Sequence, residues 1–190
     1  MNLPNKLTML RILLVPVFMV CAANRWMLAA GIIFAAASFT DYLDGSIARK
    51  RGLVTDFGKF ADPLADKLLT TTAFVYMIVD GICSPVVVVI ILAREFAVSG
   101  LRMIAAGAPG GKVIAANQWG KAKTVLQMLT IIFYYFGFAI EAGVRGSAFA
   151  GSVYTTQLVS YGLCWVVAAV TLISGVKYLW DNRQFINTAK

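Results

Sequence analysis

The chain has 190 residues, 59% of them hydrophobic, with a net charge of +8 and no histidine. Average soluble domains are about 45–50% apolar on a similar count, so the composition is typical of an integral membrane protein. Histidine metal sites and histidine general bases are excluded. Nucleic-acid binding is disfavoured, because the basic residues stand at the ends of apolar segments, where they suit anionic headgroups. The length fits one membrane domain, expected to cover residues 1–190.

Six apolar segments follow one another along the chain, and each is long enough to cross about 30 Å of hydrocarbon as a helix. The first lacks a convincing signal-peptide cleavage site, so we interpret it as a retained helix. Glycine- and proline-containing turn signals separate several of the others. The pattern predicts an all-α bundle of six transmembrane helices, at about 8–23, 27–49, 61–79, 85–106, 120–140 and 153–180.

The distribution of Lys and Arg indicates how this bundle is oriented. With the N-terminus inside, fifteen of the seventeen basic residues lie on or toward the cytoplasmic side, and Arg25 and Arg145 fall outside. This asymmetry follows the positive-inside rule. We therefore expect a multi-pass membrane protein with both termini in the cytoplasm.

Four aspartates, Asp41, Asp44, Asp62 and Asp66, interrupt the apolar pattern. A lone carboxylate at membrane depth costs roughly 2.5–3.5 kcal/mol, and four together would also repel one another. Spacings of three and four residues place each pair on one helix face, and the two segments are antiparallel neighbours, so all four can converge. Oxygen-only ligands favour Mg²⁺, Mn²⁺ or Ca²⁺, and this set suits two ions about 3.5–4 Å apart. The cluster therefore predicts a divalent-metal site facing the cytoplasm.

The residues between the aspartates suit a pyrophosphate ligand. Gly45, Ala48 and Gly58 would let a ligand approach the backbone, and Arg49 offers a fork of donors that fits phosphate. Each also has a simpler interpretation, since small residues in membrane helices usually serve packing and an arginine can anchor the interface. Asp62 followed by Pro63 is also typical of a helix N-cap, a role compatible with metal ligation.

The pattern D-x2-D-G-x2-A-R-x8-G-x3-D-x3-D is matched at all eight fixed positions. In this motif and in its six-helix layout, the chain resembles the CDP-alcohol phosphatidyltransferases. The resemblance implies that Asp41, Asp44 and Asp62 hold a dinuclear Mg²⁺ or Mn²⁺ site. It also implies that Asp66 shares in ligation and is the general base. Asp66 would deprotonate the acceptor alcohol, the alkoxide would attack the phosphorus that carries the diacylglycerol, and CMP would leave.

The remaining motif positions are implied to contact the cytidine diphosphate part of CDP-diacylglycerol, namely Gly45, Ala48, Arg49 and Gly58. Asn5, Thr8 and Arg11 lie near the expected cytoplasmic mouth, and we expect them to help bind the nucleotide or the acceptor. Asn5 could instead cap the first helix. The resemblance further implies a homodimer in the cytoplasmic membrane of a bacterium.

A second basic cluster bears on the acceptor. Arg94, Arg102, Lys121 and Lys123 lie at helix ends expected to be cytoplasmic, and none is needed for the metal site. Such a cluster suits an acceptor that carries phosphate, so glycerol 3-phosphate fits better than inositol or serine. These residues could alternatively be interfacial anchors. Arg94 is harder to explain in that way, because it stands with Glu95 inside an apolar run, where charges are usually functional.

Three further segments, LPNKLTMLR, ILAREFAVSGLR and WGKAKTVLQM, resemble bacterial members of the family that use glycerol 3-phosphate. Two other functions remain open. A transferase of the same fold could take phosphatidylglycerol and make cardiolipin, which needs no dedicated small-phosphate site. A small cation transporter would also use membrane carboxylates, but it would distribute them near the bilayer midplane and not at one helix end.

Overall fold

The computed structural model describes residues 3–51, 56–107, 114, 118–144 and 150–185. Within these ranges, the side chains of residues 3–7, 41–51, 56–63, 66, 144, 150–154 and 184 lie outside the description. The described residues form six α-helices and a short 3₁₀ helix, without a strand. They are α1 (Leu3–Ala23), α2 (Met27–Arg51), α3 (Asp56–Val79), α4 (Pro85–Gly107), α5 (Gln118–Val144), α6 (Ala150–Asp181) and η2 (Arg183–Phe185).

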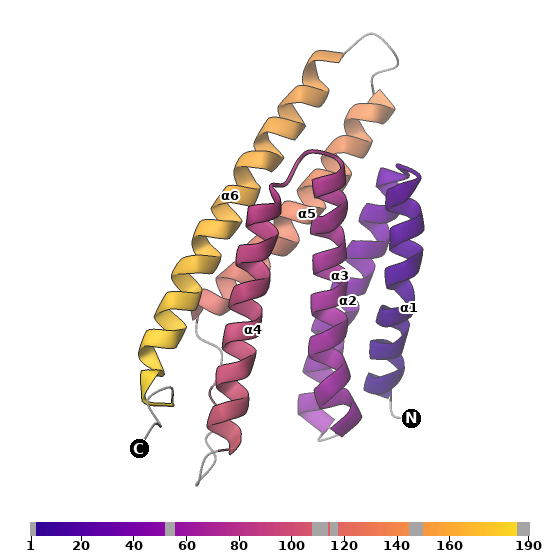
Figure 1. Cartoon of the computed structure of the whole chain (residues 1–190). Helices are drawn as coiled ribbons and strands as arrows, with labels where there is room; N and C mark the ends of the chain where they lie inside the picture. The colour runs from indigo at the N-terminus through magenta and orange to yellow at the C-terminus, as the bar shows by residue number, and fades with distance from the viewer. Residues whose placement is uncertain (1–2, 52–55, 108–113, 115–117, 145–149, 186–190) are drawn as a thin grey trace.

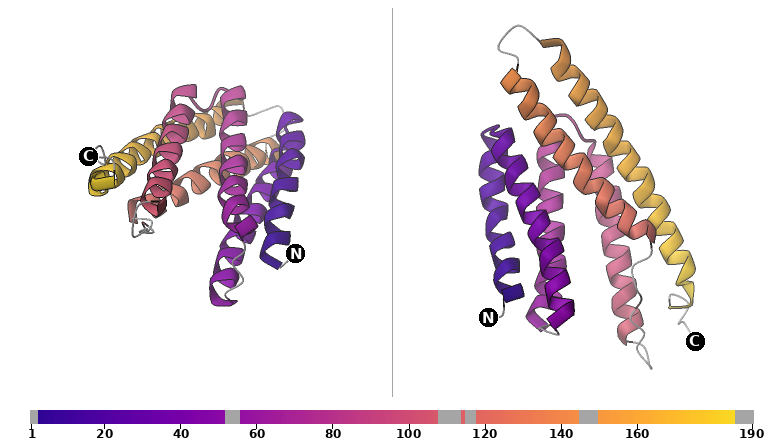
Figure 2. Two further views of the ribbon diagram at one scale, coloured as in Figure 1. Left: turned by 60° about the horizontal axis from the view of Figure 1, so that its bottom comes forward. Right: turned by 180° about the vertical axis from the view of Figure 1, so that it is seen from behind.

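The helices run roughly along one direction, and the start of α1 and the end of α6 lie at the same end of the bundle (Figure 1). We call this end of the bundle the near end and the opposite end the far end. The end of α2 and the start of α3 also lie at the near end. α1 packs against α2 and α3, α6 packs against α4, and α5 crosses diagonally between α2 and α6 (Figure 2). The contacts of α3 with α4 and α5 are sparser.

Large apolar side chains are exposed on all six helices. In a water-soluble monomer, contiguous apolar surface on this scale would be unusual. α5 and α6 contain stretches long and apolar enough to cross a membrane, and shorter apolar helical stretches occur at Thr8–Ala23, Met27–Thr40 and Lys67–Val79. Together these features define a helical membrane protein. Representative exposed residues are Leu13, Phe39, Val79, Phe96, Ile140 and Val176.

Small residues let the helices approach closely at two crossings. A Cβ atom on Gly31 of α2 would lie 3.1 Å from the ring of Phe136 on α5. A Cβ atom on Gly137 of α5 would lie 3.0 Å from Cγ2 of Thr156 on α6. Both distances are shorter than ordinary carbon contacts, so glycine is what allows α5 to sit this close to its neighbours.

The far end of the bundle is closed by two tight turns. Arg25 (φ 57°) ends α1 and Gly81 (φ 75°) ends α3, each in the left-handed region. Trp26 N donates to Cys21 O and Ile82 N donates to Met77 O, the bonding pattern of a Schellman motif. These bonds satisfy backbone carbonyls in the last turn of each helix, which would otherwise lack an intrahelical partner.

A polar cluster links these two turns to α5. Arg25 forms an ion pair of 2.9 Å with the Asp80 carboxylate. The Tyr134 hydroxyl donates to the same carboxylate over 2.6 Å. Because Asp80 is only 9% exposed, its charge depends on both partners.

Replacing Tyr134 with Phe should remove one donor from the buried Asp80 carboxylate. We expect the free energy of unfolding to fall by about 1–2 kcal/mol, measured by thermal or denaturant unfolding in detergent. Tyr135→Phe is the matched control, because the buried Tyr135 hydroxyl has no hydrogen-bond partner among the described residues. Equal losses for the two variants would contradict a specific role for the Tyr134 bond.

The prediction of six helices is confirmed, although four of them (α1, α3, α5 and α6) begin two to five residues earlier than predicted. The prediction that Asp62 caps a helix is wrong, because α3 begins at Asp56 and includes Asp62 and Pro63. Proline there removes one backbone hydrogen bond, which a helix can tolerate when its packing compensates. The alternative in which Asn5 caps α1 is also wrong, since α1 begins at Leu3.

Candidate active site

The four motif aspartates lie on the two helices that meet at the near end. Asp41 and Asp44 lie in the second half of α2, and Asp62 and Asp66 lie in the first half of α3. Their side chains lie outside the described residues, so their convergence stays a prediction. Among the described side chains, no group of three or more Asp, Glu, Cys or His could hold a metal ion. What the fold supplies is the antiparallel placement of the two helices (Figure 1).

The predicted nucleotide contacts also lie mostly outside the described side chains, namely Asn5, Gly45, Ala48, Arg49 and Gly58. Thr8 is described, and it is buried in the first half of α1. Arg11, one turn later, is also buried and donates from Nε to the carbonyl oxygen of Ala37 over 3.3 Å. Ala37 lies four residues before Asp41, so a buried positive charge stands one helical turn from the acidic segment.

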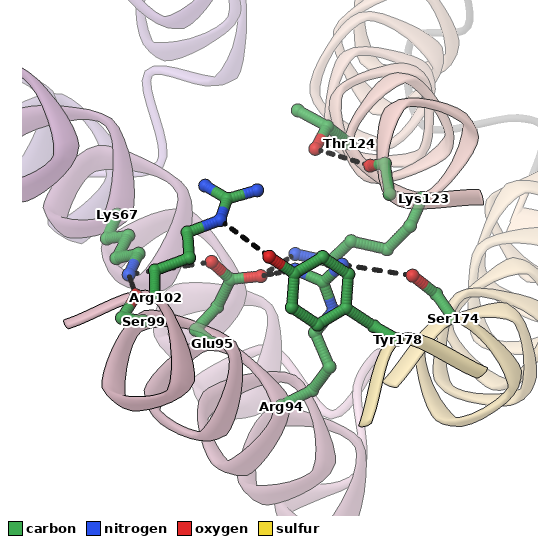
Figure 3. Close-up of polar contacts among 10 residues, drawn as sticks. Lys67, Arg94, Glu95, Ser99, Arg102, Lys123, Thr124, Ser174 and Tyr178 are labelled. Carbon is green, nitrogen blue, oxygen red and sulfur yellow. Dashed lines mark hydrogen bonds and ion pairs between the residues drawn. The ribbon is translucent and has the colours of Figure 1, made fainter. Parts of the chain in front are cut away.

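The described part of the site is a cluster of cations around the Glu95 carboxylate (Figure 3). Arg94 Nη1 lies 3.0 Å from Glu95 Oε1, and Lys123 Nζ bonds the same oxygen. Lys67 Nζ lies 3.7 Å from Oε2 and donates to Ser99 Oγ over 2.6 Å. Helices α3, α4 and α5 thus each contribute a positive charge to one carboxylate. Among the described side chains, three cations therefore share one carboxylate.

Two arginines of α4 donate hydrogen bonds to side chains of α6. Arg94 Nη2 donates to Ser174 Oγ over 3.0 Å, and Arg102 Nε donates to the Tyr178 hydroxyl over 3.0 Å. Ser174 and Tyr178 are both buried, so they offer fixed partners. Figure 3 shows these contacts beside the Glu95 cluster.

A pocket opens beside this cluster, where α3 packs sparsely against α4 and α5. Its wall includes both lysines and Glu95, together with hydroxyl groups of α3 and α5. Lys67 directly follows Asp66 in the sequence, so the pocket adjoins the α3 segment that carries the last motif aspartate. The lining residues are Lys67, Thr70, Thr71, Ile91, Glu95, Lys123, Thr124, Gln127 and Met128.

The structure brings together some of the basic residues predicted to bind acceptor phosphate. Arg94 and Lys123 share the Glu95 carboxylate, and Arg102 lies two turns from Arg94 on α4. Lys121 is exposed on α5, outside this cluster. Whether any of them binds phosphate stays a prediction.

Sequence reasoning did not assign four participants to the site, namely Lys67, Glu95, Ser174 and Tyr178. Two of them carried a usable signal. Lys67 is a charge beside a motif aspartate, and Glu95 is a charge inside an apolar run. A serine and a tyrosine in an apolar helix carry no comparable signal, because both are common packing residues there.

Glu95→Gln should destabilise the protein, because it leaves three cations without their shared counter-charge. We expect a loss of about 1–3 kcal/mol in the free energy of unfolding in detergent. Glu141→Gln is the matched control, since its buried Oε2 atom has no hydrogen-bond partner among the described residues. A Glu95→Gln protein as stable as wild type would argue against an organising role for Glu95.

Comparison with known proteins defines the class. The model of the CDP-alcohol phosphatidyltransferase family matches residues 1–173, and the chain belongs to this family. It is therefore an enzyme that transfers phosphatidyl groups, in a family that generally depends on divalent metal.

Curated relatives match nearly the whole chain. The CDP-diacylglycerol–glycerol-3-phosphate 3-phosphatidyltransferase of Bacillus subtilis (strain 168) is 38% identical, over 99% of this chain and 98% of the relative. The protein of the same name from Rickettsia felis is 37% identical, over 97% of each. A probable phosphatidylglycerophosphate synthase of Mycobacterium tuberculosis is 36% identical, over 94% of this chain and 80% of the relative.

Proposed function

We propose that this enzyme transfers the phosphatidyl group of CDP-diacylglycerol to sn-glycerol 3-phosphate, giving phosphatidylglycerophosphate and CMP in phospholipid biosynthesis. The family membership and the names of the curated relatives support the reaction. The observation that carries the choice of acceptor is the cation cluster of Lys67, Arg94 and Lys123 around Glu95.

The charge of this cluster suits a phosphate monoester. Among the described side chains, three cations share one carboxylate in a largely apolar setting. A phosphate monoester carries about −1.5 to −2 at neutral pH, since its second pKa is about 6. Glycerol 3-phosphate would therefore bring about two negative charges to this group of cations. The phosphodiester of phosphatidylglycerol carries only one negative charge, which disfavours the cardiolipin-forming alternative.

We propose that Asp41, Asp44, Asp62 and Asp66 hold two divalent ions, Mg²⁺ or Mn²⁺. An all-carboxylate donor set on two adjoining helices fits these hard cations. When bound, the ions would neutralise charge on the pyrophosphate and orient its phosphorus. Gly45, Ala48, Arg49 and Gly58 would hold the cytidine diphosphate part, with Asn5 and Thr8 nearby.

Asp66 is the proposed general base. It would accept the proton of the acceptor hydroxyl as that oxygen attacks the phosphorus that carries the diacylglycerol. Lys67 supports this assignment, because an acceptor held by its phosphate at the cation cluster would have its hydroxyl end close to the adjoining segment of α3. Such proximity is a large part of the rate gain available to a two-substrate enzyme.

The proposed setting is a bacterial cytoplasmic membrane. Helices α1 to α4 contain 21 to 25 residues each, and at 1.5 Å per residue they reach the roughly 30 Å needed to span it. We propose six spans in a single domain of residues 1–190. Both termini and the active site would face the cytoplasm, and two copies would form a homodimer.

An acceptor screen tests the function directly. The purified full chain would be given CDP-diacylglycerol, Mg²⁺ and one acceptor at a time, with CMP release as the readout. We expect glycerol 3-phosphate to support turnover at least about tenfold better than inositol, serine or phosphatidylglycerol, because only glycerol 3-phosphate combines a small size with a phosphate monoester. Preferred turnover of phosphatidylglycerol would instead establish the cardiolipin-forming alternative.

Replacing Asp66 with Asn should lower CMP release by about 10²–10⁴-fold, the range for loss of a placed general base. Asp56→Asn is the control, since Asp56 is on the same helix but outside the motif. Substantial residual turnover by a folded Asp66→Asn protein would remove Asp66 as the base.

Replacing Arg94 with Ala should raise KM for glycerol 3-phosphate by about tenfold or more, because a donor to a charged group is lost. KM for CDP-diacylglycerol should change little. Arg183→Ala, an exposed arginine stacked on Trp180, is the control. Equal increases in both KM values would argue against an acceptor role for Arg94.

A further inference from the structure

We propose that one face of α6, formed by Ser174, Gly175 and Tyr178, positions Arg94 and Arg102 and thereby sets the enzyme's preference for an acceptor that carries phosphate. The inference rests on the proposed acceptor site and extends it to residues of another helix. It concerns where the two guanidinium groups of α4 are held, and not the transfer chemistry.

Gly175 provides the space that the Arg94 side chain occupies. A Cβ atom at position 175 would lie 2.9 Å from Arg94 Cγ and 3.7 Å from Arg94 Cβ. Carbon atoms in contact are normally 3.5–4.0 Å apart, so any larger residue would displace the arginine stem. Cγ lies near the start of the arginine side chain, so a shift there also moves the atoms beyond it, including the guanidinium.

Ser174 fixes the far end of the same side chain. Its hydroxyl accepts from Arg94 Nη2, while Arg94 Nη1 is held by Glu95. Two anchors on different helices define the plane of the guanidinium. Arg94 Nε is buried and has no hydrogen-bond partner among the described residues. A planar guanidinium held in a fixed orientation has the geometry that phosphate recognition requires.

Tyr178 holds Arg102 in a comparable way, one turn further along α6. Its hydroxyl accepts from Arg102 Nε, and the Arg102 guanidinium carbon lies 5.6 Å from the centre of the tyrosine ring. Tyr178 is only 2% exposed, whereas the Arg102 side chain is exposed. The tyrosine therefore serves as a rigid support that leaves the charged group accessible.

Ser174, Gly175 and Tyr178 all face α4, where they meet the side chains of Arg94 and Arg102. Residues 174, 175 and 178 also share one side of the helix, as the spacing of three to four residues requires. Their contacts are with α4 arginines, and those arginines are separate from the metal-site motif.

The test measures the two substrates separately in purified full-length protein. The variants are Gly175→Ala, Ser174→Ala and Tyr178→Phe. Two controls on the same helix are Gly162→Ala, where an added Cβ meets nothing within 4 Å, and Ser160→Ala, whose buried hydroxyl has no partner among the described residues. The readouts are KM for glycerol 3-phosphate, KM for CDP-diacylglycerol, kcat, and competitive inhibition by inorganic phosphate.

We expect each of the three variants to raise KM for glycerol 3-phosphate and the inhibition constant of inorganic phosphate together, by about 3–10-fold. KM for CDP-diacylglycerol should stay within about twofold, and the controls should resemble wild type. A purely structural role would lower kcat or affect both substrates alike, and that result would overturn the inference. If Gly175→Ala does not fold, the other two variants decide by the same criterion.

The outcome also separates this inference from the proposed function. If Arg94→Ala weakens glycerol 3-phosphate selectively and the α6 variants do not, the role of α6 is wrong and the acceptor site stands. If wild-type protein releases no CMP with glycerol 3-phosphate, the proposed function itself fails.

Discussion

The site depends on a single carboxylate that gathers positive charge inside an apolar bundle. Glu95 meets Lys67, Arg94 and Lys123, which come from three different helices. Without an anion among them, three cations this close would repel one another strongly, since the surroundings screen charge poorly. Glu95 supplies the counter-charge that lets three helices bring these cations together. In the proposed function, the same cations would also bind the phosphate of the acceptor.

In the proposed function, the two substrates bind at adjoining parts of the molecule. The motif aspartates on α2 and α3 are assigned to the activated lipid, and the cation cluster on α3, α4 and α5 to the small acceptor. α3 is common to both, and Asp66 and Lys67 are consecutive on it. A transfer reaction needs its two substrates adjacent and each held by its own phosphate. One helix that carries ligands for both meets this need without requiring any rearrangement of the fold.

The helices and the aspartate motif could be predicted from the sequence, because each depends on residues that are close together in the chain. Apolar runs of about 20 residues predict spans, and four aspartates within 26 residues predict a site. The start of α3 was misjudged because Asp62-Pro63 has the chemistry of a helix start, although the helix continues for six residues before it. The α6 contacts could not be predicted, since Arg94 and Ser174 are 80 residues apart and only the packing of α4 on α6 brings them together.

The Arg94 side chain occupies the space that a larger side chain at position 175 would need. The size of the residue at position 175 and the presence of the arginine charge therefore depend on each other. A bulkier residue on α6 requires a shorter partner on α4, and a shorter partner leaves a void unless α6 fills it. Neither change is favourable alone. In the proposed function, a variant adapted to an uncharged alcohol would lose the Arg94 side chain, and a larger residue at position 175 could then fill the space left beside α4.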